Sequence, residues 1–160
     1  MEKKGPTPEA YPLAIRLIGM RDHSRAEIES KLRRKGCAPA DILNALQKLE
    51  RAGLLDDLAY GRNCLESITR HKPTGKMKLR TVLLGKGLPE EVVGELLRDF
   101  NGYAPCRAAA EKKLRMLHGT PEEKRKALET FLRNRGFDWN TIGRTLSELH
   151  GTGEESTDQD

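Results

Sequence analysis

The sequence predicts an all-α protein built from three tandem three-helix repeats that form an elongated, curved molecule. Two observations support this prediction. A glycine recurs at equivalent places, Gly36, Gly87 and Gly136, with spacings of 51 and then 49 residues. Apolar residues recur at fixed distances from each glycine, three or four residues apart as on one face of a helix.

Seven apolar positions match in all three copies without a gap, and together they define three helices in each copy. Two positions precede the second helix, two lie in it, and three follow the glycine. In chain order they are Ala14, Leu17, Ile28, Leu32, Ile42, Leu46 and Leu49; then Leu65, Ile68, Leu79, Leu83, Val93, Leu97 and Phe100; then Leu114, Leu117, Leu128, Leu132, Ile142, Leu146 and Leu149.

Local signals place the start of each second helix. Ser24 with Glu27, and Thr120 with Glu123, each have the spacing of a capping box. The middle copy offers Thr74 as a cap but has no acid three residues later, so we expect a looser start there.

The recurring glycine ends the second helix, because it readily adopts the left-handed conformation of a helix C-terminal cap. Pro39 and Pro89 then suit the first turn of the third helix, where a missing N–H does no harm. In the third copy, Asp138 is the expected N-cap.

These signals divide the chain into five segments, with links between repeats too short to let them drift apart. We predict a flexible head, three repeats and a disordered acidic tail: residues 1–11, 12–57, 58–102, 103–150 and 151–160.

Basic residues outnumber acidic ones by 29 to 24, which gives a net charge of +5. The last ten residues, GTGEESTDQD, hold four of the acids and no base. Without those four acids, 29 bases face 20 acids, a net charge of +9. This balance favours contact with a polyanion or an acidic protein surface.

Several classes of protein are not expected. No run approaches the roughly 20 apolar residues of a membrane span, and the first residues lack the apolar core of a signal peptide. The three cysteines form no C-x-x-C pair, so neither a disulfide framework nor a zinc knuckle is expected. The cysteines, Cys37, Cys64 and Cys106, are therefore expected to be reduced thiols in the cytoplasm. We also expect the protein to be a monomer.

No catalytic constellation is evident, so we expect no enzyme, no cofactor and no metal. The histidines are scattered, and none has the i, i+4 partner of a helical metal site. Asp56 and Asp57 are the only adjacent aspartates, and one of them is expected to cap the helix that follows. For both Tyr60 and Trp139 the alternative is contact with a partner; we favour Tyr60 half-buried between repeats, and Trp139 packed against Phe137 and the last helix.

Basic clusters are the candidate binding residues. Residues 70–87 hold six bases and no acid. With two later clusters they give the candidates for contact with a partner or with DNA: Arg70, Lys72, Lys76, Lys78, Arg80, Lys86, Arg107, Lys112, Lys113, Arg115, Arg133 and Arg135. The alternative for each cluster is a merely solvated helix face. The third helices hold few arginines, so any contact with DNA is expected to be with its backbone.

Three motifs give a resemblance to a known family. They are HSRAEIESKLRRKG at 23–36, AGLLDDLAYGR at 52–62 and LRNRGFDWNTI at 132–142. Together they resemble the bacterial RecX family over about residues 12–149. One departure is the order Pro73-Thr74-Gly75, where the family usually has Gly-Pro ahead of a basic helix; this affects a local turn.

The resemblance implies a non-enzymatic modulator of the RecA recombinase. Members of the family are built from tandem three-helix repeats and bind the RecA–DNA filament along its groove. Such binding suppresses strand exchange, ATP hydrolysis and co-protease activity. Two alternatives stay open: a protein that coats DNA through the same bases without a RecA role, and a helical-repeat adaptor for another protein.

Overall fold

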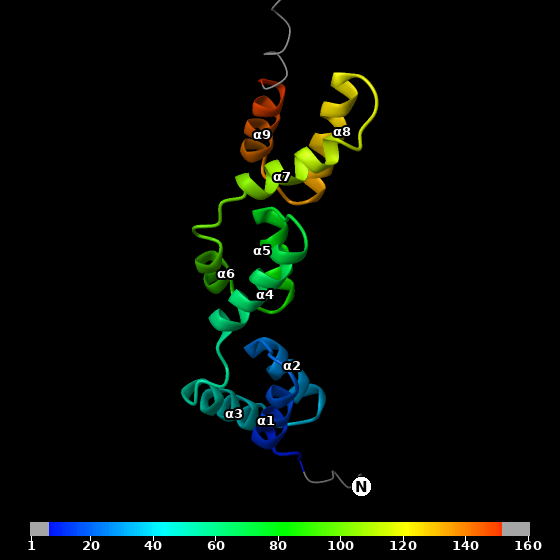
Figure 1. Ribbon diagram of the computed structural model, residues 1–160. Helices are drawn as coiled ribbons and strands as arrows, with labels where there is room; N and C mark the ends of the chain where they lie inside the picture. The colour runs from blue at the N-terminus through cyan, green and yellow to red at the C-terminus, as the bar shows by residue number, and fades with distance from the viewer. Residues whose placement is uncertain (1–6, 152–160) are drawn as a thin grey trace, which may run out of the picture. The chain divides into compact units, whose positions relative to one another are not determined.

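The computed structural model describes residues 7–151, and in this range it holds nine helices and no strand (Figure 1). The all-α class and the three-helix repeats are thus confirmed. The predicted head lies outside the described residues up to residue 6, and the predicted tail lies outside them from residue 152. Among residues 7–151, none of the helices is long and apolar enough to cross a membrane.

The chain divides into two compact units. Of the described residues, unit 1 comprises 7–64 and 83–96, and unit 2 comprises 65–82 and 97–151. Helix α4 (Asp57–His71) begins in unit 1 and ends in unit 2, and α5 (Lys76–Gly85) begins in unit 2.

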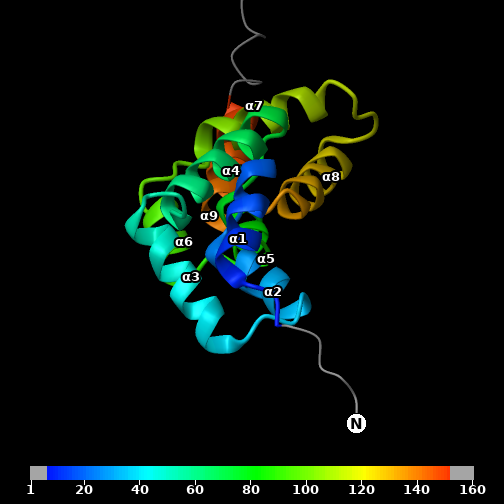
Figure 2. The ribbon, with the colours of Figure 1, turned by 90° about the horizontal axis from the view of Figure 1, so that it is seen from below.

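Helices α1 (Ala10–Met20), α2 (Arg25–Arg34) and α3 (Pro39–Arg51) pack against one another in unit 1 (Figures 1 and 2). Unit 1 also holds α6 (Glu90–Leu96). The predicted repeat positions supply the core around α1–α3, which contains Ala14, Ile28, Leu32, Ile42, Leu46 and Leu49.

Helices α7 (Tyr103–Leu114), α8 (Pro121–Asn134) and α9 (Trp139–Gly151) pack against one another in unit 2. Their core again uses the repeat positions, with Leu128, Leu132, Ile142 and Leu146 buried and Leu114, Leu117 and Leu149 packed against them. Phe137, which directly follows the repeat glycine, is buried beside them. The spacing in the sequence therefore corresponds to the buried face of each helix.

Helix caps follow the sequence signals in most places. Thr120 and Glu123 form a complete capping box at α8. The Asp138 carboxylate accepts the Thr141 N–H at 2.9 Å. Asp56 accepts the N–H groups of Leu58 and Ala59 at the start of α4, as expected of one of the two aspartates.

Two cap predictions need correction. Ser24 accepts the Glu27 N–H at 3.2 Å, but the Glu27 carboxylate pairs with Arg21 and Lys31 and does not complete a capping box. The start of α5 was expected to be loose, yet the Gly75 N–H donates to the Arg135 carbonyl at 2.8 Å. The Met77 N–H also donates to the Gly136 carbonyl, at 3.1 Å. A turn distant in sequence therefore caps α5.

The repeat glycines all have the predicted left-handed backbone, with φ of +82° at Gly36, +81° at Gly87 and +82° at Gly136. Two of these turns also contact the start of the second helix of the preceding repeat. In unit 1, the Ser24 hydroxyl donates to the Lys86 carbonyl at 2.7 Å, directly before Gly87. In unit 2, the Gly136 turn caps α5 as described. We call these two contacts the repeat seams.

Candidate polyanion-binding site

A basic groove in unit 2 brings together bases from three separate segments. Its volume is about 420 Å³. Its walls come from the end of α4 and the two residues after it, from one face of α7 and the turn that follows, and from the end of α8. We call it the unit-2 groove, and its lining residues are His71, Lys72, Pro73, Ala109, Lys112, Lys113, Met116, Phe131 and Arg135.

Helix geometry explains why these side chains meet. Ala109, Lys112, Lys113 and Met116 are separated by three, one and three residues, which places them on one face of α7 and its last turn. Pro73 follows α4 and ends it, leaving His71 and Lys72 at the end of the groove. The bases of the groove therefore converge although they come from three separate clusters in the sequence.

Phe131 gives the groove an aromatic wall between two cations. The Lys113 ammonium lies 5.4 Å from the centre of its ring, and the Arg135 guanidinium lies 5.0 Å from it. Such cation–π contacts fix the direction of two flexible side chains without neutralising their charges.

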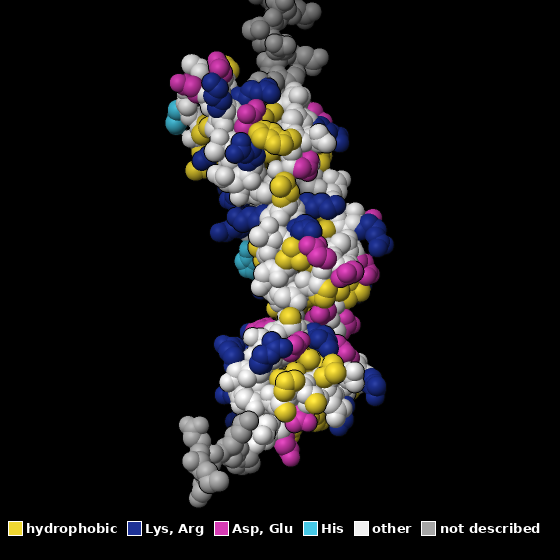
Figure 3. Space-filling model, turned by 180° about the vertical axis from the view of Figure 1, so that it is seen from behind, with side chains coloured by type: hydrophobic (Ala, Val, Ile, Leu, Met, Phe, Trp, Pro, Cys, Tyr) yellow, Lys and Arg dark blue, Asp and Glu magenta, His cyan; other side chains and the backbone are white. Residues whose placement is uncertain are grey.

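Among the residues that the structure describes, no carboxylate lines the unit-2 groove. Within residues 7–151, none of Lys72, Lys112, Lys113 and Arg135 forms an ion pair. The face shown in Figure 3 carries both basic and acidic side chains. Four uncompensated cations around one hollow create a local positive potential that favours a polyanion.

The other predicted bases are spread outside this groove. Arg70 pairs with Glu66, and Arg107 pairs with Glu111 at 2.9 Å. The Lys78 ammonium lies 3.5 Å from the Asn134 carbonyl, near the unit-2 seam. The side chains of Lys76, Arg80, Arg115 and Arg133 are exposed, and Lys86 belongs to unit 1. The sequence clusters were therefore only partly brought together.

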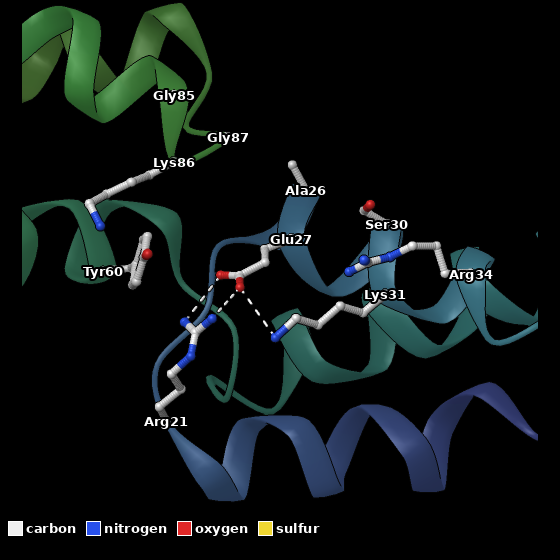
Figure 4. Close-up of a pocket in the computed structure, with 10 residues that line it drawn as sticks. All are labelled: Arg21, Ala26, Glu27, Ser30, Lys31, Arg34, Tyr60, Gly85, Lys86 and Gly87. Carbon is white, nitrogen blue, oxygen red and sulfur yellow. Dashed lines mark hydrogen bonds and ion pairs between the residues drawn. The ribbon is translucent and has the colours of Figure 1, made fainter.

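A second groove, in unit 1, was not anticipated from the sequence. It has a volume of about 430 Å³ and lies over the outward face of α2 (Figure 4). Tyr60 from α4 and the turn after α5 form the opposite wall. We call it the unit-1 groove, and its lining residues are Arg21, Ala26, Glu27, Ser30, Lys31, Arg34, Tyr60, Gly85, Lys86 and Gly87.

Glu27 organises the charges on one side of the unit-1 groove. Its carboxylate pairs with Arg21 and accepts a contact from the Lys31 ammonium at 3.3 Å (Figure 4). Partial burial acts to raise the pKa of Glu27, but the hydrogen bonds from Arg21 and Lys31 outweigh it, and the pKa lies below its usual value. The carboxylate therefore stays ionised.

His23 and Tyr60 stay neutral beside this network. Burial lowers the pKa of His23, whose Nε2 accepts from Lys31 at 2.8 Å while its Nδ1 lies 2.7 Å from the Arg21 carbonyl. Burial also raises the pKa of Tyr60 to about 12, so its hydroxyl remains a donor. Tyr60 is half-buried, as predicted.

Trp139 contradicts its prediction. The side chain is 62% exposed, and it is Phe137 that fills the core. The Arg133 guanidinium lies 5.2 Å from the centre of the indole ring. Trp139 begins α9, and its side chain does not belong to the buried core around α7–α9.

No group of three metal-binding side chains occurs in the part of the chain that the structure describes. The described residues form two grooves that are lined by basic side chains.

Comparisons with known proteins agree with this architecture. A family model described as "RecX, first three-helix domain" matches residues 10–49. A regulatory protein RecX from Chlorobaculum tepidum is 45% identical over 156 residues, covering 98% of each chain. Another, from Prosthecochloris aestuarii, is 46% identical over 143 residues, covering 89% of this chain and 95% of that one.

The fold is also similar to a solved structure. The crystal structure of RecX from Lactobacillus salivarius superimposes with a TM-score of 0.82 at 21% identity. The match covers 88% of this chain and 94% of that one. At this level of identity the likeness establishes the fold.

Proposed function

Because the chain belongs to the RecX family of regulatory proteins, we propose that it binds the RecA–DNA filament and modulates RecA. The expected effect is inhibition of strand exchange, ATP hydrolysis and co-protease activity. The observation that supports this most is the 45% identity to a regulatory protein RecX over 98% of both chains. Because the match covers nearly the whole chain, all three predicted repeats lie inside it.

The unit-2 groove supplies the physical basis of the proposal. A RecA–DNA filament carries phosphates at regular intervals, and four uncompensated cations in one hollow fit such a polymer. We propose Lys72, Lys112, Lys113 and Arg135 as its principal contacts. Several weak contacts distributed over repeats gain by multivalency when they reach adjacent subunits of a polymer.

The proposed role needs no chemical step by the protein itself. We infer that it acts without a cofactor, as a monomer in the cytoplasm, where RecA and DNA are found. A regulator of this kind works by changing how stable the filament is, through preferential binding to one of its states.

The test is DNA-dependent ATP hydrolysis by the cognate RecA, with this protein titrated below one copy per RecA subunit. Strong inhibition at such low ratios indicates action on filament growth and supports the proposal. No inhibition, even in excess and at low salt, would overturn it.

Because no carboxylate of residues 7–151 lines the unit-2 groove, a second candidate is also favoured, a protein that coats DNA without a RecA role. The two are separated by order of addition. A DNA-coating protein inhibits only when it occupies free DNA before RecA is added, and its effect disappears when DNA is in excess. A filament regulator still inhibits when it is added after RecA, and it still inhibits when DNA is in excess.

A further inference from the structure

The unit-1 groove differs from the unit-2 groove in its charge pattern. Glu27 lies in the unit-1 groove and takes up two of the four bases, Arg21 and Lys31. Within residues 7–151, the other two bases, Arg34 and Lys86, form no ion pair. The groove therefore offers two separate cations and one fixed anion, where the unit-2 groove offers cations alone.

A nucleic-acid backbone fits this pattern poorly. It places negative charges at short, regular intervals, so a strand lying in the groove would bring a phosphate near the ionised Glu27 carboxylate. Glu27 cannot easily be neutralised by protonation, since its pKa lies below the usual value. The same carboxylate is no obstacle to a protein segment, in which the charged side chains are irregularly spaced and of both signs.

The uncharged residues of the groove suit a polypeptide. Ala26, Ser30, Gly85 and Gly87 contribute little side-chain bulk. An extended or helical backbone can therefore approach α2 closely. The Ser30 and Tyr60 hydroxyls add donors along the groove, and the Arg34 guanidinium has the planar fork that matches a carboxylate in two parallel hydrogen bonds.

We propose that the unit-1 groove binds an acidic segment of a partner protein, with carboxylates at Arg34 and Lys86. The inference rests on the proposed function, because the RecA filament is the expected source of that segment. It assigns different tasks to the two grooves: the unit-1 groove recognises protein, and the unit-2 groove recognises the nucleic-acid backbone.

The test compares two charge-reversal variants of the full chain. One is Arg34→Glu with Lys86→Glu, and the other is Lys112→Glu with Lys113→Glu. A matched control, Arg16→Glu with Arg51→Glu, makes the same charge change at exposed residues outside the unit-1 groove. Circular dichroism and urea unfolding verify that each variant folds like the wild type.

Two probes are used separately: RecA immobilised without DNA, and a fluorescein-labelled oligothymidylate without RecA. We expect the Arg34/Lys86 variant to bind RecA about tenfold more weakly than the control and to bind the oligothymidylate within about twofold of it. The Lys112/Lys113 variant should show the reverse pattern.

Three results would overturn the inference. If the Arg34/Lys86 variant binds RecA as tightly as the control, the groove is not the protein contact. If it loses oligothymidylate affinity as strongly as RecA affinity, the groove is a nucleic-acid site. If the wild type itself does not bind RecA in the absence of DNA, the inference is overturned. The proposed function fails as well only if the wild type also leaves ATP hydrolysis by RecA on DNA uninhibited.

Discussion

The turn at Gly36 and the turn at Gly136 have the same backbone conformation but different surroundings. Their φ values are both +82°. A Cβ atom added at Gly36 would meet nothing within 4 Å, whereas one added at Gly136 would lie 2.3 Å from the Lys78 Cβ and 2.6 Å from the Lys78 backbone nitrogen. The first glycine is needed only for its conformation. The third is also needed because another segment lies against it.

Gly87 is intermediate between these two. Its added Cβ would lie 2.9 Å from the Ala26 Cβ and 3.2 Å from the Ser24 Oγ. The recurring glycine thus has two physical causes. One is the left-handed backbone of the turn, and the other is the close approach of another segment, which occurs only at the repeat seams. Substitution by alanine separates the two causes.

Gly136→Ala should have the largest effect. Left-handed strain and the clash with Lys78 together should lower the free energy of unfolding by about 4 kcal/mol. Urea unfolding followed by circular dichroism measures this. Gly143→Ala is the matched control in α9, where an added Cβ has open space, and it should leave stability unchanged or raise it by about 0.5 kcal/mol.

Gly87→Ala should cost less, about 2 to 3 kcal/mol. The strain is the same, but the contact with Ala26 is longer and a small shift of α2 relieves it. The same urea titration gives the value. A cost equal to that of Gly136→Ala would mean that the unit-1 seam is as rigid as the unit-2 seam.

Gly36→Ala should cost only the strain of a left-handed alanine, about 1.5 kcal/mol. Its midpoint in urea should lie closest to that of the wild type among the three variants. If Gly36→Ala proves as damaging as Gly136→Ala, backbone conformation alone explains all three glycines, and the seams contribute little to stability.

The smallest effect concerns the caps that follow these turns. Asp138 caps α9 in unit 2, while no side chain of residues 7–151 caps α3 in unit 1. Asp138→Ala should cost about 1 kcal/mol at neutral pH.

The Asp138 effect should also depend on pH. The hydrogen bond from the Thr141 backbone N–H lowers the pKa of Asp138 below its ordinary value of 3.8. Its stabilisation is therefore complete above 3.8 and is lost as the pH falls through the lower folded-state pKa. Unfolding measured across that range should show wild type and Asp138→Ala converging in acid. A constant difference would mean that the carboxylate is not the cap.

Periodicity predicted the helices because burial follows the helical period: Leu32 and Leu132 are both fully buried at the same repeat position. The seams could not be predicted in this way. The contact between Gly136 and Lys78 joins residues 58 positions apart, and nothing local in either segment signals it. The tertiary cap of α5 was missed for the same reason.

The sequence predicted the residues of the candidate site but not their arrangement in space. Lys72, Lys112, Lys113 and Arg135 were all chosen on charge, yet only the fold shows that they share one groove while Arg107 pairs with Glu111. The unit-1 groove was missed because its bases form no acid-free cluster: Lys31 and Arg34 share α2 with Glu27 and Glu29, and Arg21 and Lys86 lie outside α2. A signal was available: Ala26, Ser30 and Arg34 recur every four residues, which places two small residues and a base on one face.

The most direct test of filament regulation through the unit-2 groove is RecA ATP hydrolysis on single-stranded DNA, titrated with the wild type and with the Lys112→Glu, Lys113→Glu variant. We predict half-maximal inhibition by the wild type well below one copy per RecA subunit. The variant should need about tenfold more protein at moderate salt. Equal inhibition by both chains would remove the groove from the mechanism, and no inhibition by either would contradict the regulatory role itself.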